Sequence, residues 1–249
     1  MSYNDEHRHQ RDSRILFDAV RHMYTAIGTD GRQTLCESVT TVVEDLFDKF
    51  DADYWARRKA TPERPADVLK AEWEAKGRAA REKGTRMHDR IERHYLGEEP
   101  EEEALADGAF RNFLRFAEKV QLRPYRSEWR IFSEKYRIAG TLDFLAFDGS
   151  GFAIWDWKRS SKIVDCDGCP ITEDRYGKHA HAPIWHIPDT VYHHYALQLS
   201  LYRYILESEY GIFAASGHLG NFHPDYDRPY VVDVPYLRDE VQAILAARL

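Results

Sequence analysis

Three adjacent segments in the second half of the chain alternate apolar and polar residues and are separated by short turn sequences. They are PYRSEWRIF (124–132), YRIAGTLDFLAF (136–147) and GFAIWDWKR (151–159), and the turn sequence DGSG (148–151) leads into the last of them. Period-two alternation with many aromatic and β-branched residues is typical of strands, and connections this short favour antiparallel pairing. The sequence therefore predicts an antiparallel meander at the centre of the fold.

Segments with a helical period precede and follow this meander along the chain. The chain also has an Asp30-Gly31 hairpin turn within 23–35 and β-prone runs near 214–222 and 229–234. This order of elements predicts an α/β protein in which helices flank a mixed central β-sheet. Helices are expected over 15–20, 40–50, 65–95 with a break at 83–84, 110–120, 192–210 and 237–249, and loops over 98–107 and 160–190.

The length and charge of the chain set limits on its class. A chain of 249 residues with 43% hydrophobic residues buries a core, and no window approaches the roughly 18 consecutive apolar residues of a membrane span. Three cysteines do not make a disulfide framework, so we expect a cytoplasmic protein, in a bacterium or a phage-infected host, with no membrane partner. The net charge of −7 does not indicate a nucleic-acid partner, although residues 55–93 hold twelve Lys and Arg against seven Asp and Glu. This local excess of positive charge is equally typical of a helix surface that faces solvent.

The third strand carries the first candidate site residues. Because side chains alternate along a strand, Asp156 and Lys158 project from one face, and Trp155 and Trp157 project from the other. If the strands pair through the turn at 148–151, Asp143 comes beside Asp156. Two adjacent carboxylates repel each other, and a hard divalent cation such as Mg²⁺ or Mn²⁺ relieves that repulsion. The alternative interpretation is an ordinary Asp–Lys ion pair on an exposed face, with both tryptophans in the core.

Further polar residues lie where they can address the same site. His88 follows Gly84 on a predicted helix, Gln198 and Tyr202 are four residues apart on another, and Glu128 lies on the first strand. Gly140 leaves room for the close approach of a ligand. Each of these residues alone is equally typical of a surface or core position. Their combination with Asp143 and Asp156 indicates a metal-dependent site.

Four short motifs resemble those of a known family. GTRMH (84–88), GTLD (140–143), DWK (156–158) and QLSLY (198–202) have the order and approximate spacing of RecB-like nucleases of the PD-(D/E)XK superfamily. Within that group, SVTT (38–41), FDADYWA (50–56), PYRSEW (124–129) and WDWKRS (155–160) resemble phage-type and mitochondrial-genome-maintenance-type exonucleases. The resemblance spans roughly residues 24–240. Leu142 stands where the superfamily name has proline.

The resemblance implies a single nuclease domain over 1–249, with a restriction-endonuclease-like core over 84–249 and a helical N-terminal lobe over 1–83. It implies a Mg²⁺- or Mn²⁺-dependent deoxyribonuclease, an exonuclease at single-stranded or flap ends in DNA replication, repair or recombination. The alternatives are a structure-specific or restriction-type endonuclease and a catalytically inert nuclease-like DNA-binding module.

The resemblance also implies roles for individual residues. The metal ligands would be His88, Asp143, Asp156 and the main-chain carbonyl of Trp157. Lys158 would help to position the attacking water and stabilise developing negative charge, and it would stay protonated between carboxylates. The remaining roles are orientation of substrate or of a metal-bound water by Gln198 and Tyr202, assistance by Glu128, and phosphate contacts by Lys83, Arg86 and Arg90.

The long loop contains Cys166 and Cys169 at a metal-knuckle spacing. One interpretation is zinc held by these cysteines with two of His179, His181 and His186; the other is an ordinary loop with free thiols. Related nucleases with an iron–sulfur cluster use four cysteines, one before GxxxH and three after QxxxY. Here Cys36 lies upstream, the pair precedes Gln198 and a fourth is missing, so we expect no iron–sulfur cluster.

Overall fold

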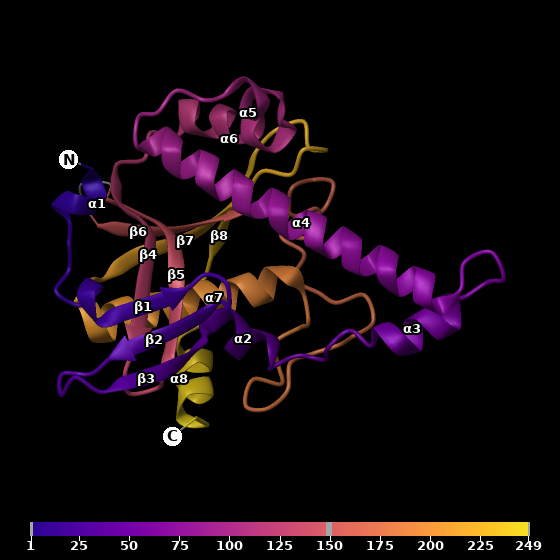
Figure 1. Cartoon of the computed structure of the whole chain (residues 1–249), viewed down its shortest axis with the longest axis horizontal. Coiled ribbons are helices and arrows are strands. Elements are labelled where there is room, and N and C mark those ends of the chain that lie inside the picture. The colour runs from indigo at the N-terminus through magenta and orange to yellow at the C-terminus, as the bar shows by residue number, and fades with distance from the viewer. Residues whose placement is uncertain (1, 148–150, 249) are drawn as a thin grey trace.

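The computed structural model describes residues 2–147 and 151–248, and these residues form an eight-stranded mixed sheet with helices on both sides (Figure 1). The strand order is β1-β2-β3-β5-β6-β7-β8, and β4 pairs with β5 beside this path. The α/β class with a mixed, helix-flanked sheet is thus confirmed. The strands are β1 (Ile15–Asp18), β2 (Met23–Ile27), β3 (Gln33–Ser38), β4 (Pro124–Ser133), β5 (Ile138–Phe147), β6 (Phe152–Lys158), β7 (Ala214–Asn221) and β8 (Tyr230–Val234).

The helices form two groups on opposite faces of the sheet, each over its own hydrophobic core. The larger core joins the sheet to α2, α7 and α8, and the smaller, aromatic core joins it to α4 and α6. The helical segments are α1 (Tyr3–Glu6), the 3₁₀ turn η1 (Asp12–Arg14), α2 (Val39–Glu44), α3 (Ala52–Lys59), α4 (Ala66–Tyr95), α5 (Glu102–Ala106), α6 (Gly108–Lys119), α7 (Val191–Ile205), its π-helical continuation η2 (Leu206–Tyr210) and α8 (Arg238–Ala246).

The expected meander is present. β4 and β5 pair antiparallel over nearly their whole length, and β5 and β6 pair antiparallel from Phe147–Phe152 to Phe144–Trp155. Most of the predicted turn at 148–151 lies outside the described residues. The strands predicted near 214–222 and 229–234 and the helix predicted over 192–210 are also confirmed, within one residue at each end. The helix predicted over 237–249 is present as α8, which ends at Ala246.

One edge of β5 is shared by two different strands. β4 occupies the other edge, so β3 and β6 must both pair on this one. β3 pairs in parallel with the beginning of β5 at Ile138 and Ala139, whereas β6 pairs with its end from Phe144 onward. The two neighbours therefore leave residues 140–143 of β5 between them, and the candidate site lies at this gap.

Two expectations for the first 83 residues are wrong. Residues 15–20 do not form a helix, because Ile15 to Asp18 pair with β2 as strand β1. Their few apolar residues fit a helical period as well as a strand, and pairing with the hairpin decided the outcome. Nor is the region helical throughout: the hairpin, confirmed with Gly31 at φ +79°, is continued into the main sheet by β3.

The helix predicted over 40–50 is shorter than expected. It is capped by Ser38, whose hydroxyl accepts the Thr41 N–H at 3.0 Å, and it ends at Glu44. Thr41 and Glu44 have the spacing of a capping box, but Ser38, three residues before Thr41, takes the capping position. Phe47, after the helix, is buried and stacks on His194 of α7.

The break expected at 83–84 is absent, since α4 runs through Gly84 as one helix of 30 residues. A single glycine lowers the stability of a helix by only about 1 kcal/mol relative to alanine, and the helix-forming residues on either side of Gly84 offset this cost. Helix α5 lies within the segment predicted as the acidic loop 98–107. The first half of α4 and α3 pack on each other and extend away from the sheet (Figure 1).

The long segment 160–190 is a loop, as expected. Asn221 at the end of β7 fixes its start, because its side chain accepts the Ser160 N–H at 3.1 Å and donates to the Ser160 carbonyl at 2.9 Å. Among the described helices, none combines the length and apolar character that a membrane span needs.

Candidate metal and nucleic-acid site

Side chains from α4, β4 and β5 bring three metal-ligand atoms together at the gap in the sheet. His88 Nδ1 lies 3.7 Å from Glu128 Oε1 and 3.6 Å from Asp143 Oδ2. One ligand atom from each residue lies within 4.8 Å of the others. Atoms that share one Mg²⁺ at about 2.1 Å lie about 3 to 4 Å apart, so this spacing fits a common cation.

Glu128 reaches the site through an unusual backbone conformation. The register pairs Ser127 with Phe144 and Trp129 with Leu142, which sets Glu128 opposite Asp143. Its φ of +45° is rare for a residue with a side chain, and such a conformation costs about 1–3 kcal/mol. Strained residues of this kind concentrate at functional sites. The sequence carries no signal for this strain.

His88 is positioned by the apolar stripe of α4. Met87 and Ile91 are buried in the aromatic core, and His88 lies beside this stripe. Its Nε2 is 2.8 Å from the carbonyl oxygen of Trp157. Burial lowers the pKa of His88, but Asp143 and Glu128 outweigh it and raise the pKa to about 9. The ring is therefore protonated at neutral pH, and a cation bound through Nδ1 would displace that proton.

Asp156 and Lys158 form a buried ion pair. The Lys158 ammonium lies 2.5 Å from Asp156 Oδ2, and Asp156 is 1% exposed. Burial raises the pKa of Asp156 to about 7 against the opposing effect of Lys158. Burial lowers the pKa of Lys158, but Asp156 and Asp143 raise it above its ordinary value, so Lys158 stays protonated as expected. The alternative of an exposed ion pair is wrong.

The buried carboxylate of Asp156 is incompletely satisfied. Within the described part of the chain, neither of its oxygens accepts a hydrogen bond of good geometry. The Lys158 ammonium lies close to Oδ2 but leaves Oδ1 without a donor. A buried carboxylate oxygen without a donor is costly, and a hard cation supplies a further partner. Asp156 lies outside the group formed by His88, Glu128 and Asp143, but its pKa is raised by Asp143. The residues present thus fit one or two divalent cations.

Asp143 and Trp157 connect the two diverging strands. The Trp157 N–H donates to Asp143 Oδ2 at 2.8 Å, just beyond Phe144–Trp155, the last pair of the β5–β6 ladder. The Trp157 carbonyl, expected as a metal ligand, faces His88 Nε2. Both Trp155 and Trp157 lie in the aromatic core, as expected for packing residues.

Gln198 and Tyr202 project from α7 into the same region. Gln198 Nε2 donates to the Tyr202 hydroxyl at 3.3 Å, and burial raises the pKa of Tyr202 well above its ordinary value. Sequence reasoning missed Tyr195, whose ring lies 4.4 Å from the Lys158 ammonium. Its position three residues before Gln198, on the same helix face, was the available signal.

Gly140 makes room for Tyr202, which corrects the expectation that it admits a ligand. A Cβ at residue 140 would lie 2.6 Å from Tyr202 Cε1 and 2.8 Å from its hydroxyl oxygen. Because Tyr202 is buried, its ring cannot move aside freely. The glycine therefore sets the distance between α7 and the gap in β5.

Gly140→Ala is expected to lower the free energy of unfolding by about 1–3 kcal/mol, because the added methyl group overpacks a buried ring. Gly84→Ala is the matched control, since a Cβ there meets nothing within 4 Å and alanine favours the helix. Thermal unfolding of both variants checks this. Equal stability of Gly140→Ala and the wild type would contradict the packing described for Tyr202.

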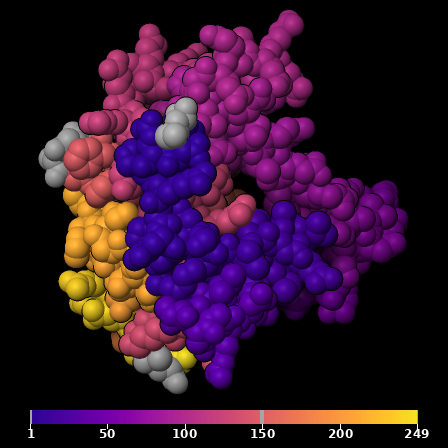
Figure 2. Space-filling view, turned by 60° about the vertical axis from the view of Figure 1, so that its left-hand side comes forward, coloured from indigo at the N-terminus to yellow at the C-terminus, as the bar shows by residue number. Residues whose placement is uncertain are grey.

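The predicted phosphate-contacting residues line a basic hollow of about 360 Å³. Lys83, Arg86 and Arg90 of α4 lie there, but Arg90 is engaged by Asp107 at 2.9 Å and by Glu103 at 3.4 Å. Arg159, which sequence reasoning missed although it follows Lys158, also lines the hollow. For the residues that the structure describes, no ion pair with a carboxylate involves Lys83, Arg86 or Arg159. The surface is also hollowed between α4 and the N-terminal strands (Figure 2).

The cysteine pair does not form a metal site in the structure. Cys166 and Cys169 are free and exposed. Across residues 2–147 and 151–248, the one group of three potential metal ligands is His88, Glu128 and Asp143, so the structure does not bring His179, His181 or His186 together with the thiols. The zinc site considered from the sequence is thus not assembled.

Comparison with known proteins gives no family for this chain. No family model and no curated protein matches it. Among solved structures, a chain described as "Crystal structure of SSO0001" matches with 16% identity and a TM-score of 0.27, over 65% of this chain and 81% of that one. A similarity of this size supports no conclusion about fold or function.

Proposed function

We propose that the protein is a Mg²⁺- or Mn²⁺-dependent nuclease whose α/β sheet is a restriction-endonuclease-like core. The observation that carries the proposal is the convergence of His88, Glu128 and Asp143 beside the buried Asp156–Lys158 pair, in which Asp156 Oδ1 has no hydrogen-bond donor among the described residues. A structural ion pair alone would not require two further carboxylates and a histidine at the same gap.

The residues of the site have different roles in phosphodiester hydrolysis. His88, Asp143, Glu128 and Asp156 would hold the cation, which when bound lowers the pKa of a water and neutralises charge on the phosphate. Lys158 stays protonated and directs its ammonium at developing negative charge. The Gln198 amide and the Tyr202 hydroxyl, which are hydrogen-bonded to each other, orient the substrate.

The basic hollow supports a nucleic-acid substrate. Lys83, Arg86 and Arg159 have no carboxylate partner among the described residues, and such cations are suited to backbone phosphates. We propose DNA, attacked from single-stranded or flap ends, as the substrate. The second candidate is an endonuclease with the same site. An inert binding module is disfavoured by the complete set of ligand and ammonium groups.

End-labelled linear and closed circular single-stranded DNA, incubated with the protein and Mn²⁺ or EDTA, test this proposal. We expect Mn²⁺-dependent loss of the linear DNA alone. Cleavage of the circles would establish the endonuclease instead. Binding without hydrolysis in Mn²⁺ would contradict the nuclease assignment.

Cation binding is expected to be pH-dependent and to release protons. His88, with a pKa of about 9, and Asp156, with a pKa of about 7, must lose protons to act as ligands. The affinity for Mn²⁺ should therefore rise from pH 6.5 to 8.5, by up to about tenfold per pH unit for each proton released. Calorimetry in two buffers of different ionisation enthalpy measures the proton count. An affinity independent of pH, with no proton released, would rule out these ligands.

A further inference from the structure

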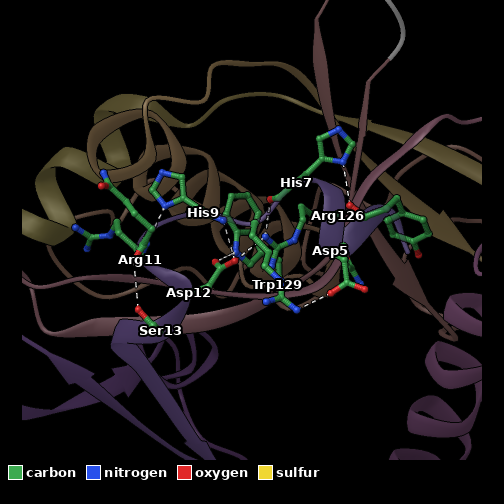
Figure 3. Close-up of polar contacts among 12 residues, drawn as sticks. Asp5, His7, His9, Arg11, Asp12, Ser13, Arg126 and Trp129 are labelled. Carbon is green, nitrogen blue, oxygen red and sulfur yellow. Dashed lines mark hydrogen bonds and ion pairs between the residues drawn. The ribbon is translucent and has the colours of Figure 1, made fainter. Parts of the chain in front are cut away.

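The N-terminal strap, residues 3–12, lies along β4 (Figure 3). In the described part of the chain β4 pairs with β5 alone, so its other edge is open to this segment. Polar groups of the strap bond to β4 residues on both sides of Glu128, the strained residue of the candidate metal site. The strap therefore contacts the stretch of β4 that sets the direction of the Glu128 side chain.

Before Glu128, the strap holds Ser127. The Asn4 side chain accepts the Ser127 N–H at 2.9 Å and donates to its hydroxyl at 3.0 Å, and the Tyr3 hydroxyl donates to the same oxygen at 3.0 Å. The Ser127 hydroxyl in turn donates to Glu92 at 2.8 Å. Glu92 lies one turn after His88 on α4. Ser127 thus joins the strap, the strand that carries Glu128 and the helix that carries His88.

After Glu128, the strap holds Trp129. Asp12 accepts the Trp129 indole N–H at 2.7 Å through one oxygen and Arg126 Nη1 at 2.8 Å through the other (Figure 3). Arg126 also donates to the carbonyl of His7 at 2.8 Å, and its guanidinium lies 4.5 Å from the Trp129 ring. Both neighbours of Glu128 are therefore fixed by the same short segment.

We propose that the strap is a positioning element for Glu128, and that Asn4 and Asp12 act through Glu128 on the cation affinity of the site. A positive φ at a non-glycine residue persists only where its surroundings hold it. When the bonds to Ser127 are lost, β4 can relax at Glu128 and its carboxylate moves away from His88 Nδ1. This inference rests on the proposed cation site.

Asn4→Ala in the full chain tests the inference with Mn²⁺ as the probe and calorimetry as the readout. The expected result is an affinity for Mn²⁺ weakened about 5- to 30-fold, which corresponds to the loss of part of one ligand. Arg8→Ala is the matched control, because Arg8 is in the strap and pairs with Asp5 at the exposed surface. The control should bind Mn²⁺ as the wild type does.

A double-mutant cycle separates positioning from a general loss of stability. In the Glu128→Gln background, Asn4→Ala should change the Mn²⁺ affinity less than twofold, because the group through which it acts is already altered. Equal losses in both backgrounds, or an unchanged affinity in Asn4→Ala, would overturn the inference and leave the proposed function intact. Failure of the wild type to bind Mn²⁺ would overturn both.

Discussion

Asp143→Asn is expected to reduce metal-dependent DNA hydrolysis by about a thousandfold or more while the protein stays folded. The amide oxygen of asparagine can still accept the Trp157 N–H that Asp143 accepts at 2.8 Å, so the link between β5 and β6 is kept. The charge that faces His88 and a shared cation is lost. A thousandfold loss corresponds to about 4 kcal/mol, which is within the range for removing a central electrostatic group.

The matched control for this variant is Asp233→Asn, since Asp233 on β8 is 89% exposed and accepts a contact from His218 at 2.8 Å that asparagine can also accept. The rate of release of labelled nucleotide in Mn²⁺ measures both variants. Wild-type hydrolysis by folded Asp143→Asn would show that the chemistry lies elsewhere.

Lys158→Met is expected to separate hydrolysis from cation binding. The substitution removes the Lys158 ammonium, which lies 2.5 Å from Asp156, and keeps an unbranched side chain of similar length beside the Tyr195 ring. Hydrolysis should fall about 100-fold or more, because the charge that stabilises the developing anion is gone. Affinity for Mn²⁺ at pH 8.5 should stay within about tenfold of the wild-type value, since a like charge no longer competes for Asp156 while the loss of Lys158 raises the pKa of that carboxyl further.

Parallel measurements of hydrolysis and Mn²⁺ binding decide between a catalytic and a structural Lys158. If the two fall together, and the free energy of unfolding falls with them, the lysine acts as a structural partner of Asp156. A fall in hydrolysis with retained binding supports its role with the substrate.

The meander and its two acids could be predicted from the sequence because the relevant signals are local. Alternation along 151–159 placed Asp156 and Lys158 opposite two core tryptophans, and the structure has this arrangement. The short turn sequence predicted antiparallel pairing of β5 and β6, which brought Asp143 near Asp156. Such local patterns also predicted α7 and β7.

The rest of the site depends on tertiary packing that leaves no local pattern. The division of one β5 edge between β3 and β6 joins segments about one hundred residues apart, and the positive φ of Glu128 has no sequence signal. Tyr202 fills the space at Gly140 only because α7 packs there. For the same reason the residues from Ile15 to Asp18 do not reveal a strand by their own pattern, since pairing with β2 determines their conformation.

Anomalous diffraction from a crystal soaked in Mn²⁺ locates the cation relative to the gap in β5. We expect an anomalous peak within about 2.5 Å of His88, Asp143 and at least one of Glu128 and Asp156. The peak should be absent from crystals of Asp143→Asn and present in those of Asp233→Asn. If saturating Mn²⁺ gives peaks at surface carboxylates of the wild type and none at this gap in the sheet, His88, Asp143, Glu128 and Asp156 do not form a cation site.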